Sequence, residues 1–187
     1  MARLSAFNNI SLDGYFSGKN GEFAWAKSHM DPEFNAFVAS NAQTGGTLVF
    51  GRVTYELMAS YWPTPLALQS DPVVAERMNN LPKIVFSRTL SSVAWNNTKL
   101  VKADPADEIR RLKATSAGAL VILGSGSIVS QLAQAGLIDE FQVVVNPVIL
   151  GEGRTMFDGL KHSLGLKMTR NRIFPSGNAF LCYEPAA

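Results

Sequence analysis

Short apolar segments recur along this chain of 187 residues and alternate with segments of helical pattern. Ala119–Leu123 is apolar throughout, which is typical of a strand buried on both faces of a parallel sheet. Thr47–Phe50 and Lys83–Phe86 are similar short strands, and Arg52–Tyr61 carries apolar residues at helical spacing. Strands that alternate with helices predict an α/β fold with a mostly parallel central sheet and helices on both faces.

The pattern changes toward the C-terminus. Leu166–Phe174 and Ala179–Glu184 are strand-like, and Pro175–Asn178 between them is typical of a turn. These segments predict an antiparallel hairpin added to the sheet. A hairpin at a sheet edge is exposed unless another surface covers it, so we expect a homodimer.

Length and composition predict a single domain over residues 1–187. Lys and Arg number 17 and Asp and Glu 15, and a net charge of +2 gives no reason to expect nucleic acid or a membrane as partner. Cys182 is the lone cysteine, and His29 and His162 lack partners at metal-binding spacing, so we expect no metal. The N-terminus lacks the apolar core of a signal peptide, which predicts a cytoplasmic protein.

Three predicted strand ends carry residues that suit an anion. Gly51-Arg52-Val53-Thr54, Ser87-Arg88-Thr89 and Gly124-Ser125-Gly126-Ser127 each follow a strand. Taken singly, each is explained equally well as a tight turn or an exposed loop. Ligands of open α/β sheets bind beyond the carboxyl ends of the strands, so we expect the three turns to meet at one edge. Three phosphate-compatible turns fit a dinucleotide with a pyrophosphate and an additional 2′-phosphate, which is NADPH.

With these turns in this order, the sequence resembles the dihydrofolate-reductase-like family, and within it the reductase domain of the bacterial riboflavin bifunctional deaminase-reductase. The matching segments cover nearly the whole chain and are Ser11–Tyr15, Phe50–Glu56, Lys83–Leu90, Gly124–Ser127, Leu137–Glu140 and Pro147–Gly153, followed by Phe157. One cysteine cannot build the zinc pattern of the deaminase domain, so the resemblance is to a stand-alone reductase.

The resemblance implies NADPH-dependent hydride transfer to a pteridine-like or ribosylaminopyrimidine substrate. One such activity is 5-amino-6-(5-phosphoribosylamino)uracil reduction in riboflavin biosynthesis. The implied cofactor contacts lie in the three turns and in the loop after the first strand; they are Gly14, Gly51, Arg52, Thr54, Ser87, Arg88, Gly124, Ser125, Gly126 and Ser127. Among them, Ser87 and Arg88 match the segment beside the 2′-phosphate, and Gly124–Ser127 matches the pyrophosphate loop.

Candidate catalytic and substrate-binding groups lie near the N-terminus. We expect Asp13 to be the catalytic residue, with a structural turn as the alternative. Trp25, Asp31 and Glu33 are candidate substrate contacts. Their alternatives are core anchoring for Trp25, helix capping for Asp31 and compensation of the helix dipole for Glu33. A non-catalytic nucleotide- or ligand-binding protein on the same fold remains the alternative function.

Overall fold

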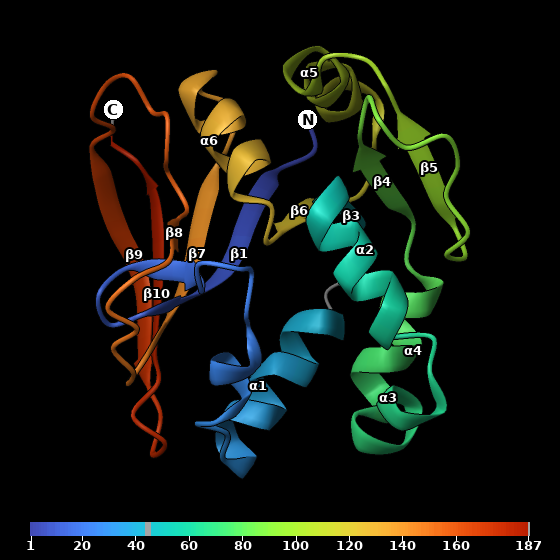
Figure 1. Cartoon of the computed structure of the whole chain (residues 1–187). Helices are drawn as coiled ribbons and strands as arrows, with labels where there is room; N and C mark the ends of the chain where they lie inside the picture. Colours follow the sequence, from blue (N-terminus) through green and yellow to red (C-terminus); the bar gives the residue numbers. More distant parts are fainter. Residues whose placement is uncertain (44–45, 187) are drawn as a thin grey trace.

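The computed structural model describes residues 1–43 and 46–186, which form an eight-stranded sheet with helices packed against it (Figure 1). The strand order is β5-β4-β3-β6-β1-β7-β10-β9. These strands are β1 (Leu4–Ser11), β3 (Thr47–Gly51), β4 (Lys83–Phe86), β5 (Thr98–Val101), β6 (Leu120–Leu123), β7 (Glu140–Asn146), β9 (Leu166–Ile173) and β10 (Ala179–Pro185).

The helices connect these strands. They are η1 (Ala24–Lys27), α1 (Pro32–Gln43), α2 (Arg52–Tyr61), α3 (Pro65–Ser70), α4 (Pro72–Asn80), α5 (Pro105–Thr115) and α6 (Gly126–Gln134). A separate two-stranded sheet pairs β2 (Tyr15–Ser17) with β8 (Arg154–Thr155). Neither the short sheet nor α3 was predicted from the sequence. Pro65 suggests a helix end, but it is the first residue of α3, and Thr64 caps that helix.

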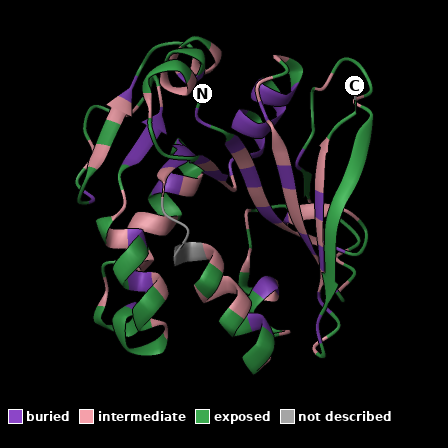
Figure 2. Ribbon diagram, turned by 180° about the vertical axis from the view of Figure 1, so that it is seen from behind, coloured by how far each residue is buried: buried purple, intermediate pink, exposed green. Residues whose placement is uncertain are grey.

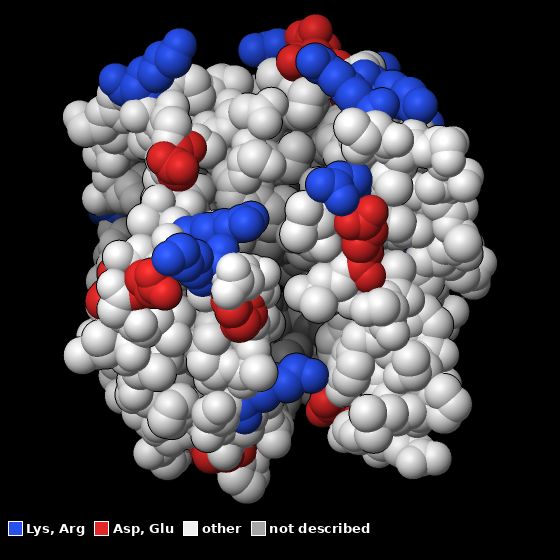
Figure 3. Space-filling view, viewed as in Figure 1, with Lys and Arg blue, Asp and Glu red and all other residues white. Residues whose placement is uncertain are grey.

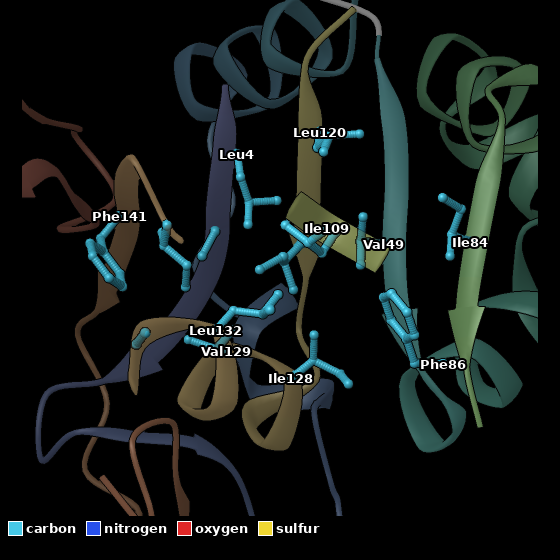
Figure 4. Close-up of a cluster of buried hydrophobic side chains, with 14 of the residues drawn as sticks. Leu4, Val49, Ile84, Phe86, Ile109, Leu120, Ile128, Val129, Leu132 and Phe141 are labelled. Atoms are coloured by element: carbon cyan, nitrogen blue, oxygen red, sulfur yellow. The ribbon is translucent and has the colours of Figure 1, made fainter. Parts of the chain in front are cut away.

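The predicted fold class is confirmed. The six strands from β5 to β7 in the sheet order are parallel to their neighbours, while β10 runs antiparallel to both β7 and β9. Side chains alternate between the two faces of the sheet. One face packs against α5 and α6, and its core includes Leu4, Val49 and Leu120 (Figure 4). The other face packs against α1, α2 and α4. Buried residues therefore concentrate along the centre of the sheet (Figure 2).

The ammonium group of Lys83 is buried in the core on the sheet face that packs against α2 and α4. Lys83, the first residue of β4, has 1% of its surface exposed. Its Nζ donates hydrogen bonds to the carbonyl oxygens of Met78, Asn79 and Leu81 at the end of α4, and lies 4.5 Å from the centre of the Trp95 ring. Burial lowers the pKa of Lys83 to about 8, which leaves the group protonated at pH 7. Its three protons then match the three carbonyl oxygens at the helix end.

We expect Lys83→Met to lower the free energy of unfolding by about 3 kcal/mol at pH 7, because buried carbonyl oxygens would lose their donor. Urea denaturation measures the difference. Lys167→Met on the exposed strand β9 is the matched control and should change stability by less than about 0.5 kcal/mol. Equal stability of the two variants would contradict the role assigned to Lys83.

Candidate functional site

A cavity of about 1410 Å³ lies at the carboxyl ends of the parallel strands. Its walls come from the turns after β3, β4 and β6, from β1, and from the helices α1, α2 and α4. In Figure 3 it is the cleft that divides the face of the molecule, with Lys and Arg side chains around its rim. The volume exceeds the roughly 300–1,000 Å³ usual for one small ligand, so it has room for a cofactor and a substrate together.

Two of the predicted turns are joined to one another. The backbone N–H of Gly51 donates to Oγ of Ser125 at 2.7 Å, and the backbone N–H of Ser125 donates to Oγ1 of Thr54 at 2.9 Å. No side chain caps the start of either helix: Gly51 precedes α2, and the hydroxyl of Ser125, which precedes α6, accepts from Gly51 instead. The unpaired N–H groups at both helix starts are therefore left to a ligand, and such groups bind phosphate well.

The turn after β6 has a conformation that restricts its sequence. Gly124 has a φ of 58° and Ser125 a φ of 58°, both in the left-handed region. A Cβ atom added at Gly124 would lie 2.9 Å from Cγ2 of Thr54. The close approach of the two turns thus requires glycine at this position.

The third turn lies one strand further along the sheet. Oγ of Ser87 accepts hydrogen bonds from the backbone of Thr89 and Leu90, at 3.2 and 3.0 Å. Arg88 is exposed and lines the cavity. Lys102 also lines the cavity, and our sequence analysis did not single it out. Lys102 directly follows β5, as Ser87 directly follows β4, and this position after a strand could have identified it from the sequence.

Nine of the ten predicted cofactor contacts line this one cavity; they are Gly51, Arg52, Thr54, Ser87, Arg88, Gly124, Ser125, Gly126 and Ser127. Gly14 lies outside its lining, in the turn between β1 and β2. The charged side chains along the cavity are mostly basic. They comprise Lys27, Arg52, Arg77, Arg88, Lys102 and Arg154 against Asp71 and Asp158. The cavity is therefore more basic than the chain as a whole and suits an anionic ligand.

The far part of the cavity is apolar. It lies between β1 and α1, where Phe7, Met30, Phe34 and Val38 contribute to its walls. Phe34 packs against Phe174 of the C-terminal hairpin, with 5.1 Å between ring centres. An apolar wall of this kind excludes water and can hold a flat ring.

The structure places Asp13 outside the cavity lining. Its Oδ1 accepts a hydrogen bond from the backbone N–H of Leu150 at 3.1 Å, and its Oδ2 accepts one from Gly151 at 2.8 Å. The Ser11 hydroxyl and these backbone amides hold the pKa of the Asp13 carboxyl below its usual range. The geometry thus gives Asp13 a structural role between two loops, and its catalytic role stays a prediction.

The predicted substrate contacts also lie outside the lining. Oδ1 of Asp31 caps α1 by accepting from the backbone of Glu33 and Phe34, and its Oδ2 accepts from Ser176 at 3.0 Å. The Ser176 hydroxyl and these backbone groups hold the pKa of Asp31 below its usual range.

Glu33 and Trp25 have partners of their own. Glu33 forms an ion pair with Arg172 at 2.5 Å. The indole of Trp25 donates to the carbonyl oxygen of Glu22 at 3.1 Å. Asn178 also bonds to the carbonyl of His29, so the C-terminal hairpin holds the start of α1 at several points.

The residues 3–181 match the RibD C-terminal domain, and the chain belongs to that family. YyaP, an uncharacterised protein of Bacillus subtilis, is 29% identical over 94% of this chain and 90% of its own length. A putative riboflavin biosynthesis protein from Shewanella sp. PV-4 is 25% identical, with a TM-score of 0.79 over 100% of both chains.

The fold is that of dihydrofolate reductase. The enzyme from Enterococcus faecalis, solved with NADP(H) and RAB-propyl, has a TM-score of 0.66 and 20% identity, over 99% of this chain and 97% of that one. Within residues 1–43 and 46–186, no helix is long and apolar enough to cross a membrane. The described side chains also form no cluster of three or more His, Cys, Asp or Glu residues that could hold a metal ion.

We expect Gly124→Ala to lower the free energy of unfolding by about 2–3 kcal/mol, because a left-handed backbone and a clash with Thr54 add together. Gly136→Ala is the matched control. Gly136 also has a positive φ, 65°, but a Cβ atom there meets open space. Gly136→Ala should lower the free energy of unfolding by about 1 kcal/mol. Chemical denaturation compares the two, and equal losses would show that the turns are not tightly fitted.

Proposed function

We propose that this chain is an NADPH-dependent reductase that transfers hydride to a pteridine-like or ribosylaminopyrimidine substrate. The observation that carries the proposal is the meeting of three anion-compatible turns around one basic cavity. Membership of the RibD C-terminal domain family supports a reductase. The NADP(H) complex of the Enterococcus faecalis enzyme, which shares the fold, supports the cofactor.

The cavity divides naturally between two ligands. The starts of α2 and α6 would hold the pyrophosphate, because their backbone N–H groups have no side-chain cap. Arg88 and Lys102 would flank the 2′-phosphate, since β4 and β5 end at the same level. The apolar part between β1 and α1 would receive the substrate ring.

NADPH, when bound, supplies the hydride, and the protein orients the ligands and excludes water. Phe7, Phe34 and Val38 serve the second task here. Acidic groups among the described lining residues are Asp71, on the N-terminal side of α4, and Asp158. A proton needed by the substrate would then come through water or through a group that moves toward the ring on binding.

We expect Arg88→Ala to weaken NADPH binding by roughly tenfold to a hundredfold, the loss expected for one hydrogen-bonded charge on a phosphate. NADH lacks the 2′-phosphate, so its affinity should hardly change. Titration calorimetry with both cofactors measures the difference. Arg110→Ala, on the exposed face of α5, is the control and should affect neither cofactor. Equal weakening of NADPH and NADH by Arg88→Ala would place the 2′-phosphate elsewhere.

A non-catalytic ligand-binding protein is the second candidate function. The arrangement of Asp13, Asp31 and Glu33, each held by contacts within the fold, favours it. The two functions separate when NADPH oxidation is followed with pteridines and aminopyrimidines. With an active substrate, a catalytic Asp13 predicts at least about a hundredfold lower turnover for Asp13→Asn at unchanged NADPH affinity. Intact turnover with lower folding stability would assign Asp13 to the contact between loops.

Homodimer formation stays a proposal. Strand β9 is exposed along its whole length at the edge of the main sheet (Figure 2), and Leu166, Met168 and Ile173 are among its exposed side chains. An unpaired edge of this length favours association. Sedimentation velocity at micromolar concentration tests it, and a monomer would contradict it.

A further inference from the structure

The apolar part of the cavity contains an amide that protrudes from the central strand β1. Asn9 is half-buried and lines the cavity. It lies on the same face of β1 as Phe7, which packs against the cluster that contains Phe34 and Val144. The amide of Asn9 therefore faces α1, on the side of the cavity that we assign to the substrate ring.

A second asparagine fixes which amide atom of Asn9 faces the cavity. Asn146 on β7 is fully buried, and its Nδ2 lies 3.2 Å from the carbonyl oxygens of Ile10 and Val144. Because backbone carbonyls only accept hydrogen bonds, the amino group of Asn146 must point toward them. The same Nδ2 lies 3.2 Å from Oδ1 of Asn9, so its two hydrogens are shared among three oxygens, and the opposite orientation of Asn9 would place two amino groups against each other. Oδ1 of Asn9 is thus held inward, and its Nδ2 is turned toward the cavity.

The donor that results has no partner among the residues that the structure describes. Nδ2 of Asn9 makes no hydrogen bond to any of them, and Phe7, Phe34 and Val38 contribute to the same part of the cavity wall. Oδ1 of Asn146 is buried without a partner among the described residues, which is an unfavourable state for a polar atom. The fold tolerates this unsatisfied acceptor while holding Asn9 in one orientation, which suggests that the orientation is used.

We propose that Asn9 is a specificity-determining residue whose Nδ2 donates a hydrogen bond to a carbonyl oxygen of the bound substrate ring, with Asn146 as its positioning residue. This inference rests on the proposed function for the location of the substrate, and it adds the class of substrate to that function. The donor on Asn9 would select heterocycles that carry a ring carbonyl over those that carry an amino group at the same position. The carboxamide of NADPH has a carbonyl too, so the test titrates NADPH in parallel to separate the cofactor from the substrate ring.

Two ligands of the same shape test the proposal. Pteridine-2,4-dione presents carbonyl oxygens where pteridine-2,4-diamine presents amino groups. The wild-type protein should bind the dione more tightly, in titrations monitored by ligand fluorescence with and without NADPH. Asn9→Asp keeps the shape but replaces the donor with an acceptor, so the dione-to-diamine affinity ratio should fall by at least about tenfold. NADPH affinity, measured in parallel, should stay the same.

Control variants separate positioning from folding. Asn171→Asp, on the exposed strand β9, introduces the same charge away from the cavity and should leave the ratio unchanged. Asn146→Leu should move the ratio toward one without altering NADPH affinity, because Asn9 would lose its orientation. If Asn146→Leu does not fold, Asn9→Asp still decides the question, together with Asn9→Leu, which removes the whole amide and adds no charge.

Three outcomes overturn the inference. An unchanged ratio in Asn9→Asp removes Asn9 from substrate recognition. A loss of NADPH affinity as large as the loss of dione affinity assigns the hydrogen bond to the cofactor instead. A wild-type protein that binds the dione no better than the diamine contradicts the selected class. A wild-type protein that prefers the dione, loses this preference in Asn9→Asp and does not bind NADPH would support Asn9 and refute the reductase function, so the two proposals can fail separately.

Discussion

The ligand cavity depends on the two hydrogen bonds that join the turn after β3 to the turn after β6. These strands are parallel neighbours, so their carboxyl ends lie side by side. The hydroxyls of Thr54 and Ser125 join the turns by accepting backbone N–H groups. Gly51 and Ser125 precede α2 and α6, and neither helix start has a side-chain cap. The contacts that join the turns thus hold two uncapped helix starts beside one space, where their N–H groups suit an anion.

The two parts of the cavity use different chemistry. Near the strand ends, cations and helix starts dominate, which suits phosphate groups. Near α1 the walls are apolar and the polar groups are amides. Asp13, Asp31 and Glu33 are the acidic residues near β1 and α1 in the sequence, and each connects loops, helices or strands to one another. Discrimination between substrates in this part would therefore rest on neutral hydrogen bonds, which depend on the ligand's pattern of donors and acceptors more than on its charge.

Local features were predictable from the sequence, whereas long-range pairings were not. The bounds of α2 and α5 and the cap at Asp31 follow from apolar spacing, proline and a capping side chain, which act within a few residues. The three anion-compatible turns could be predicted because each directly follows its strand. The contacts of Asp13 with Leu150 and of Asn9 with Asn146 span residues far apart in the chain, and no local pattern marks them. Lys83 is buried although lysine is rarely so, because α4 ends beside it.

The attachment of α1 to the C-terminal hairpin determines when the cavity can form during synthesis. Arg172, Ser176 and Asn178 hold the start of α1, and Phe174 packs against Phe34. These partners leave the ribosome among the last residues of the chain. The strand ends that would receive the cofactor are made earlier. The residues of the strand ends are therefore made before the hairpin that holds α1, and a chain shortened by its last hairpin would keep the former and lose these contacts of α1.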